Sequence, residues 1–540
     1  MIFAVPDQHG SEAPPFPAFN GGLRDLFSTL DDLLSCGGDP RLMLDPISRL
    51  NDYGCGPAPS PQTLSFASST ASSISERGYE RAGLAREELM RSAISLGLEE
   101  ALEERIETMR EELKAHLLLP AGVDVVFSPS GTDSQLHALF LARRLLGPRL
   151  TTVVVGSDQT GSGTAYTARG RHFSRFTAGG VPVRKDTAIA DLVGDAVMLP
   201  LADATGLRMR PDADAAVLAA VETAVKGGGR VLLQIMDASK LGWRAPSAAC
   251  LDEIARRWPA EVRVLVDACQ MRLSRRRLGA YLHRGYLVLV TGSKFFGGPA
   301  FSGALLVPSL LSQALAATNG GASGLIHYAN RNDWPKHWEG LRERFESRAN
   351  FGQWLRWEAA LEEIRAYYEV PAAFRAMALR ELSAGIESLI ALSPSLRLIG
   401  PGAGTSVADD EEFREGTIFP FTIERQGRAL SATDCRVLYQ ALAQDLSDVI
   451  AVSAPDRDIL ARHCLIGQPV RIERQASEPT AALRLCAGAR AVTENWSQDP
   501  VIAAQNLHRE LDHVAETVAK IELLLTHTDA AKLTELSHGN

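Results

Sequence analysis

Two stretches of sequence decide the fold: "VRVLVDACQ" (residues 262–270) and "YLVLVTGSKFFGG" (residues 286–298). Each starts with a mainly apolar run and then turns polar, at Asp267 in the first and at Lys294 in the second. Short continuous apolar runs are typical of strands that are buried on both faces. Because lysine is costly to bury, a lysine among Gly, Ser and Thr at a strand end predicts that a ligand approaches it closely.

Similar apolar runs occur before and after these two stretches. Apolar runs alternate with helical stretches such as "DADAAVLAAVETAVKGG" (residues 212–228), which predicts an α/β domain with a mostly parallel sheet. Such sheets bind ligands at the carboxyl ends of their strands. The further strand candidates are "VDVVFS" (123–128), "TTVVVG" (151–156), "AVMLPL" (196–201), "RVLLQIM" (230–236) and "FSGALLVP" (301–308).

Three regions follow from this pattern. Residues 1–60 are rich in Pro, Gly and Asp and predict an N-terminal arm with one short helix near "LRDLFSTLDDLL". Residues 61–350 predict the large α/β domain, which includes a Ser/Thr-rich patch at 65–75 that resembles a loop or helix cap and a long helical pattern from about 80 to 118. Residues 351–540 predict a smaller C-terminal α+β domain.

Composition narrows the class of protein. The 540 residues are 45% hydrophobic and carry a net charge of −9, so no basic excess of the kind that nucleic-acid binding needs is present. No run of about 18 apolar residues predicts a membrane span, and the first residues do not resemble a signal peptide. The seven cysteines fit neither a disulfide framework nor a metal site. We therefore expect a cytoplasmic protein.

Other polar groups stand where strands end. In "SPSGTDSQ", Ser130, Gly131 and Thr132 follow a strand and open a helix, and free backbone N–H groups there favour a phosphate. Gln270 lies three residues after Asp267, which on its own would also fit a helix N-cap. In the smaller domain, "ALRLCAGAR" offers Arg484 as a bidentate carboxylate ligand, with Arg490 as its competitor.

Together these groups predict one cofactor. A lysine can form a Schiff base with an aldehyde, an aspartate can face a ring nitrogen that stays protonated, and a helix N-terminus can hold a phosphate. Pyridoxal 5'-phosphate presents all three partners. The order of phosphate loop, Asp267 and Lys294 on successive strands is far more specific than any one of these motifs.

At these residues the chain resembles the fold-type I pyridoxal-phosphate enzymes, in the group of class V aminotransferases and cysteine desulfurases. "VDACQ" is similar to the group's "VDxxQ" motif, and "TGSKFFGGPAFSGAL" to its lysine motif. The resemblance implies a large mostly parallel seven-stranded sheet, a small-molecule amino-acid substrate, and a homodimer with the active site at the interface. It also implies the following roles: Lys294 as the Schiff-base residue and proton shuttle, Asp267 at the pyridinium nitrogen, Gln270 at the ring oxygen, Thr132, Thr291 and Ser293 at the phosphate, and Arg484 at the substrate carboxylate.

The chain departs from the group at the cofactor ring. Where the group has a stacking histidine, "GSDQTGSGT" offers Gln159, and in "MDASKLGW" Ser239 stands where an asparagine is usual. Ser293 precedes Lys294 in place of a histidine. The cofactor is well specified by the sequence, whereas the reaction is specified less closely.

Two reactions remain nearly balanced, with cysteine desulfurase-like C–S chemistry slightly favoured. In "ARHCLIGQPV", Cys464 follows His463, which could lower the pKa of the thiol and make it a persulfide carrier; the alternative is a structural buried cysteine. The rival reaction is amino-group transfer, or elimination or replacement at the β or γ carbon, also through a Cα carbanion. A non-catalytic ligand sensor is less favoured, because the chain has no helix-turn-helix pattern.

Overall fold

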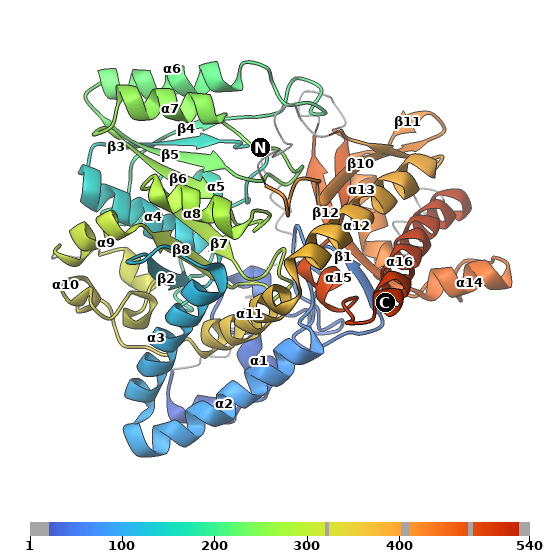
Figure 1. Ribbon diagram of the computed structural model, residues 1–540, viewed down its shortest axis with the longest axis horizontal. Coiled ribbons are helices and arrows are strands. Elements are labelled where there is room, and N and C mark those ends of the chain that lie inside the picture. The colour runs from blue at the N-terminus through green and yellow to red at the C-terminus, as the bar shows by residue number, and fades with distance from the viewer. Residues whose placement is uncertain (1–20, 319–322, 401–409, 473–478, 529–540) are drawn as a thin grey trace.

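The computed structural model describes residues 21–318, 323–400, 410–472 and 479–528, which form two β-sheets with helices around them (Figure 1). The larger sheet lies at the left of Figure 1 and the smaller at the right, with helices α2, α3 and α11 below them. Within the described ranges, no helix combines the length and the apolar character that a membrane crossing requires.

The larger sheet has, among the described residues, seven strands in the order β2-β8-β7-β6-β5-β3-β4. Strand β8 runs antiparallel to both of its neighbours, and the other pairs are parallel. This arrangement confirms the predicted α/β class with a mostly parallel seven-stranded sheet. The strands are β2 (Asp124–Ser128), β3 (Leu150–Val155), β4 (Asp195–Leu199), β5 (Arg230–Met236), β6 (Val262–Asp267), β7 (Leu287–Thr291) and β8 (Gly303–Val307).

Successive residues of the central strands face two different cores, because side chains alternate across a sheet. On β6, Val264 and Val266 belong to the first core and Leu265 to the second. Buried residues of α6 (Ala213–Lys226), α7 (Ala248–Arg257) and α8 (Arg275–His283) complete the first core. Those of α4 (Gly131–Leu146) and α9 (Ser309–Ala316) belong to the second, so the central strands are mainly apolar on both faces.

The helical pattern predicted from about 80 to 118 is divided into α2 (Glu76–Leu96) and α3 (Leu98–Leu117). Gly97 separates them with a φ of 84°, a left-handed conformation that glycine adopts without the steric cost of a Cβ. Both helices pack against α11 (Phe351–Glu369), which is buried along most of its length.

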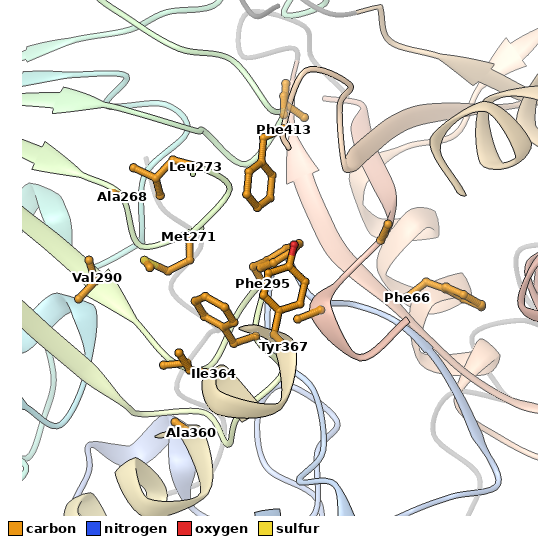
Figure 2. Close-up of a cluster of buried hydrophobic side chains, with 14 of the residues drawn as sticks. Phe66, Ala268, Met271, Leu273, Val290, Phe295, Ala360, Ile364, Tyr367 and Phe413 are labelled. Carbon is orange, nitrogen blue, oxygen red and sulfur yellow. The ribbon is translucent and has the colours of Figure 1, made fainter. Parts of the chain in front are cut away.

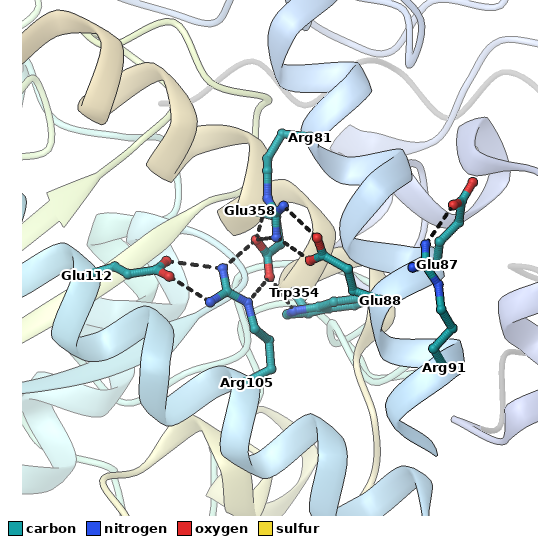
Figure 3. Close-up of polar contacts among 8 residues, drawn as sticks. All are labelled: Arg81, Glu87, Glu88, Arg91, Arg105, Glu112, Trp354 and Glu358. Carbon is teal, nitrogen blue, oxygen red and sulfur yellow. Dashed lines mark hydrogen bonds and ion pairs between the residues drawn. The ribbon is translucent and has the colours of Figure 1, made fainter. Parts of the chain in front are cut away.

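A buried carboxylate joins these three helices (Figure 3). Glu358 of α11 is 1% exposed and accepts hydrogen bonds from Arg81 of α2, at 3.1 and 3.2 Å, and from Arg105 of α3, at 2.6 and 2.7 Å. The indole of Trp354 donates a further bond at 3.0 Å. Ala360, two residues after Glu358 on α11, contacts the loop that carries Lys294. The network therefore fixes the helix against which that loop packs.

The smaller sheet has the order β1-β12-β13-β10-β11, with β9 paired to β10. Its first strand, β1 (Thr63–Phe66), pairs in parallel with β12 (His463–Arg471), although residue 63 lies in the range predicted for the large domain. The other strands are β9 (Leu396–Leu398), β10 (Ile418–Arg425), β11 (Arg428–Ala429) and β13 (Ala481–Cys486). Its helices are α12 (Ala372–Leu392), α13 (Ala432–Leu442), α14 (Ala454–Ala461), α15 (Ala489–Thr493) and α16 (Pro500–His527).

One buried arginine binds three carbonyl groups of the N-terminal arm. Arg356 of α11 is fully buried and donates hydrogen bonds to the carbonyls of Leu34 at 2.9 Å, Cys36 at 2.5 Å and Gly37 at 3.0 Å. It also donates to the carbonyl of Phe301, at 2.9 Å, which lies in the loop after Lys294. The arm therefore lies against the candidate site, and its short helix is α1 (Leu30–Leu34), within the predicted stretch.

Candidate active site

Asp267 and Lys294 meet at the carboxyl edge of the larger sheet. Strands β6 and β7 are parallel neighbours, and Asp267, the last residue of β6, pairs with Leu289 of β7. Asp267 is buried and accepts a hydrogen bond from the backbone N–H of Cys269, at 3.2 Å. Lys294 is half-buried three residues beyond the end of β7 and forms no ion pair with a described carboxylate. The structure thus brings together the two residues on which the sequence prediction rests.

The loop that carries Lys294 is anchored by aromatic packing on one side (Figure 2). Phe295 is fully buried and lies edge-to-face against Tyr367, with ring centroids 5.2 Å apart, and against Phe413 at 5.0 Å. On the other side, Gly292 and Gly298 leave so little room that an added Cβ would lie 2.4 and 2.8 Å from the Cβ of Ala360. Because the residues next to Lys294 are fixed in this way, the backbone position from which the lysine side chain extends is also fixed.

The first turn of α4 contacts the same edge. The hydroxyl of Ser130 caps the helix by accepting a bond from the N–H of Asp133, while the N–H groups of Gly131 and Thr132 have no intrahelical acceptor. A Cβ on Gly131 would lie 2.9 Å from Sγ of Cys269, and one on Gly163 would lie 2.4 Å from a methyl of Thr132. The helix N-terminus is therefore packed between the ends of β6 and β7 and the loop after β3, where an anion can meet free N–H groups.

Gln159 and Ser239, the two residues that replace the group's usual cofactor contacts, lie together. The hydroxyl of Ser239 donates to Oε1 of Gln159 at 2.6 Å and accepts from the N–H groups of Leu241 and Trp243. Both side chains are buried, so each is oriented by the other.

Two other predicted cofactor ligands are partly committed to the protein. Thr291 donates its hydroxyl hydrogen to the carbonyl of Cys269, at 2.7 Å, so in this arrangement that hydrogen is not available to a phosphate. Gln270 donates to the carbonyl of Ser69 and accepts from Arg272, which leaves one amide hydrogen for a ligand. Ser293 is buried and makes no side-chain hydrogen bond to a described residue.

Arg484 is a buried cation without a described counter-ion. It is 2% exposed, and its Nη2 donates to the hydroxyl of Thr70 at 3.1 Å and to the carbonyl of Gln468 at 2.6 Å. Its Nε is buried and has no described acceptor, and burial lowers its pKa. A buried guanidinium in this state fits a carboxylate ligand. The competing candidate, Arg490, is already paired with Glu494 at 3.0 Å.

The structure does not bring Cys464 and His463 to this site. Gly467 of β12 pairs with Arg484 of β13, so these two residues share a face of the smaller sheet. Cys464 is an odd number of residues from Gly467 and points to the opposite face, under α16, where Thr517 and Lys520 are its neighbours. Burial raises the pKa of the thiol, and His463 is exposed. These positions favour the alternative interpretation of Cys464, a buried structural cysteine, over a thiolate activated by His463.

Three groups at the site were missed in the sequence. Ser69 and Thr70, in the Ser/Thr-rich patch interpreted as a loop or cap, hold Gln270 and Arg484. Lys240 follows β5, and its carbonyl accepts a bond from Nη1 of Arg484 at 3.5 Å. The density of hydroxyls at 65–75 was the available signal for Thr70, whereas Ser69 acts through its backbone carbonyl, and nothing in "MDASKLGW" distinguishes Lys240 from a surface lysine.

No protein-family model and no curated protein matches the chain. Among solved structures, it is similar to a NifS-like protein, with 15% identity over 83% of this chain and 98% of that one and a TM-score of 0.43. It is also similar to the cystine C-S lyase C-DES in complex with cysteine persulfide, with 16% identity over 84% and 98% and a TM-score of 0.46. A third similar structure is the phosphoserine aminotransferase SerC from Cytophaga hutchinsonii, with 14% identity over 85% and 99% and a TM-score of 0.45.

The fold itself rests on the chain's own topology. Among the described residues, the mostly parallel seven-stranded sheet agrees with the sheet that the sequence resemblance implies, and the structure adds that its member β8 is antiparallel. This architecture is the α/β class with a large, mostly parallel sheet that the sequence predicts.

Proposed function

We propose that the chain is a pyridoxal-phosphate-dependent enzyme that acts on an α-amino acid. The observation that carries this proposal is the meeting of Lys294, Asp267 and the N-terminus of α4 at one edge of the sheet, beside the guanidinium of Arg484, which has no described counter-ion and whose Nε has no described acceptor. Without a ligand, burying each of these polar groups at a strand end or in a core would cost free energy.

The residues present fit this cofactor. The close packing around Gly131 and Gly163 leaves the first N–H groups of α4 at the surface of a narrow cradle, which suits a phosphate. Lys294 has no described carboxylate partner to hold it away from an aldehyde. When bound, pyridoxal phosphate supplies an aldehyde carbon that reacts with amines and a ring that accepts electrons from Cα.

The chain's own residues would then divide the remaining tasks. Asp267 would stabilise a proton on the ring nitrogen, because a buried carboxylate stabilises a positive charge beside it. Arg484 orients the substrate through its carboxylate, and Lys294 is the base and acid that moves the proton at Cα. Gln159 and Ser239, which fix each other, support the site from the loops after β3 and β5.

The position of Cys464 favours a reaction that needs no thiol at that position. Amino-group transfer, elimination or replacement meets this condition, whereas a desulfurase that uses Cys464 as its persulfide carrier does not. We expect Cys464→Ala to leave the reaction with a substrate amino acid unchanged, measured as product formed per enzyme. Loss of sulfide release from cysteine in this variant, with an intact fold, would restore the desulfurase interpretation.

The first test is the visible absorption spectrum of the protein with the cofactor. We expect the wild type to show a yellow Schiff-base band that borohydride bleaches, with the cofactor then covalently attached at Lys294. Lys294→Ala should lack the attachment. A wild type that gains no band on addition of pyridoxal phosphate would overturn the proposal.

We also propose that the chain forms a homodimer, which the family resemblance supports. Sedimentation equilibrium should then give twice the mass of one chain. A single-chain mass over the whole concentration range would be the contrary result.

A further inference from the structure

Arg272 is a buried arginine beside the candidate site, and no task described so far uses it. It lies five residues after Asp267, the last residue of β6, and is 5% exposed. It forms no ion pair with a carboxylate in the part of the chain that the structure describes, and its Nε is buried without a described acceptor. Burying a charged group in this way costs free energy, so the position of Arg272 needs a physical reason.

The guanidinium of Arg272 connects three parts of the site. Its Nη1 donates to the side-chain Oε1 of Gln270 at 2.8 Å and to the backbone carbonyl of the same residue at 2.9 Å. Its Nη2 donates to the hydroxyl of Ser68 at 2.8 Å, in the segment that follows β1 of the smaller sheet. Its Cζ lies 5.6 Å from the ring centroid of Phe295, the residue directly after Lys294. One side chain therefore contacts the end of β6, the segment after β1 and the loop that carries the lysine.

A residue in a strained conformation stands between Gln270 and Arg272. Met271 has a φ of 53°, a left-handed conformation that costs free energy in a residue with a Cβ. Its N–H donates to the carbonyl of Ala268 at 2.8 Å, which closes a tight turn after Asp267. Such strain persists only where the surrounding contacts maintain it, and the bonds from Arg272 to Gln270 are contacts of this kind.

The amide of Gln270 is held in a single orientation by its two partners. Its Nε2 donates to the backbone carbonyl of Ser69 at 3.0 Å, and its Oε1 accepts from Arg272. A carbonyl can only accept and a guanidinium can only donate, so exchanging the two ends of the amide would break both bonds. The second hydrogen on Nε2, which no described residue accepts, therefore keeps one direction.

The carbonyl of Ser69 is itself fixed by the contacts of its neighbours. The thiol of Cys486 on β13 donates to the hydroxyl of Ser69 at 3.1 Å, and the hydroxyl of Thr70 accepts from Arg484 at 3.1 Å. This half of the arrangement belongs to the backbone, which no substitution removes. Arg272 is therefore the half that a substitution can remove.

We propose that Arg272 is a positioning residue that holds the amide of Gln270 so that its free N–H donates to the ring oxygen of pyridoxal phosphate. This inference rests on the proposed function and assigns a further residue to the same site. Without Arg272, Oε1 of Gln270 would lose its donor and the amide could turn away from the ring oxygen. An N–H that donates to an oxyanion stabilises its negative charge, so the loss should be visible in the bound cofactor.

The test compares two ligands, pyridoxal phosphate and its analogue that lacks the ring oxygen. Each is titrated into the full-length, cofactor-free protein, and the absorption band gives the affinity for the wild type and for Arg272→Met. We expect Arg272→Met to weaken the binding of pyridoxal phosphate by about 10-fold and to leave the binding of the analogue within about twofold. A purely structural role would weaken both equally. Arg276→Met, which removes the same charge from an exposed position of α8, is the matched control.

The pH dependence of the yellow band gives a second readout. A donor at the ring oxygen favours loss of the Schiff-base proton, so Arg272→Met should keep the band to a pH about one unit higher than in the wild type. Burial is the main cause that lowers the pKa of Arg272, to about 10; Cys486 acts in the opposite direction and Arg484 lowers it further. Arg272 is therefore charged below about pH 9, where the band is measured.

A double-mutant cycle shows whether Arg272 acts through Gln270. Gln270→Leu removes the donor itself and should raise the pH at which the band is lost by a similar amount. Adding Arg272→Met to Gln270→Leu should then add less than half of its single effect, because the two residues form one hydrogen-bonded unit. Fully additive shifts would overturn the inference, because they would show that Arg272 acts on the cofactor independently of the amide.

Two other results would also overturn the inference. One is an equal effect of Arg272→Met on the two ligands, or no effect on either. The other concerns Arg272→Lys, which keeps the charge without the planar fork and replaces Arg272→Met if that variant does not fold. It should shift the band in the same direction by a smaller amount, and a wild-type value would contradict the positioning role. The failure of the proposed function itself is seen separately, as a wild type that gains no band with either ligand.

Discussion

Replacing Glu358 with glutamine tests whether the buried carboxylate in Figure 3 holds α2 and α3 to α11. The change keeps the size of the side chain and removes the charge that faces Arg81 and Arg105. Breaking a buried ion pair costs about 3–5 kcal/mol. Because both arginines keep an outer partner, Glu88 and Glu112 respectively, we expect the lower end, about 3 kcal/mol.

The matched control lies in the same figure. Glu87 and Arg91 form an ion pair at 3.1 Å, but their side chains are 59% and 70% exposed. An exposed pair one helical turn apart contributes about 0.3–0.5 kcal/mol, so Glu87→Gln should have almost no effect.

Amide hydrogen exchange followed by mass spectrometry measures the local opening of these helices. We expect exchange in α2, α3 and α11 to rise by about 100-fold in Glu358→Gln and by about twofold in Glu87→Gln. If the two variants increase exchange equally, or if Glu358→Gln changes it by less than about tenfold, the network does not hold the helices together.

Three further predictions concern the cradle and the helices. In Gly163→Ala, the new methyl would displace Thr132, and we expect cofactor affinity in a spectroscopic titration to fall by about tenfold. Gly161→Ala, whose new methyl would have its nearest contact 3.8 Å away, should leave the affinity unchanged. Equal effects of the two variants would contradict the proposed phosphate site at the N-terminus of α4. Burial and the nearby Asp39 raise the pKa of Asp133 from 3.8 to about 7, so the folded state holds a proton that the unfolded state releases, and stability falls as the pH rises through this window. Thermal denaturation of the cofactor-free protein should show that Asp133→Asn removes this decline, and a wild-type stability that rises with pH over the window and is unchanged by the variant would contradict it. Gly97→Ala should lower the free energy of unfolding by about 1 kcal/mol in chemical denaturation because of the left-handed φ, and a gain in stability would show that the conformation is not strained.

The fold and the centre of the site were predictable because their signals are local. Buried parallel strands appear as continuous apolar runs, and Asp267 and Lys294 each stand at the end of one such run. Neighbouring parallel strands end at the same edge, so the meeting of these two residues follows from the strand pattern.

The other features of the site depend on contacts between residues far apart in the sequence, which a local sequence pattern does not show. The face on which Cys464 lies is set by the register of β12 against β13, and only the structure shows it. The contact between the carbonyl of Lys240 and Arg484 joins residues of two different sheets. The division of the 80–118 pattern at Gly97 was visible as a residue type, but a glycine inside a helical pattern does not by itself reveal its φ.

The pairing of β1 with β12 has a consequence for biosynthesis. Thr63 leaves the ribosome long before its partner His463, about 400 residues later. At translation rates of about 5–20 residues per second, β1 waits tens of seconds for a strand to pair with. The larger sheet, whose strands are all made within that interval, is complete in sequence first. We therefore expect the nascent chain to assemble the lysine-bearing edge before the segment with Ser69 and Thr70 is locked across it, so that the site is closed only near the end of synthesis.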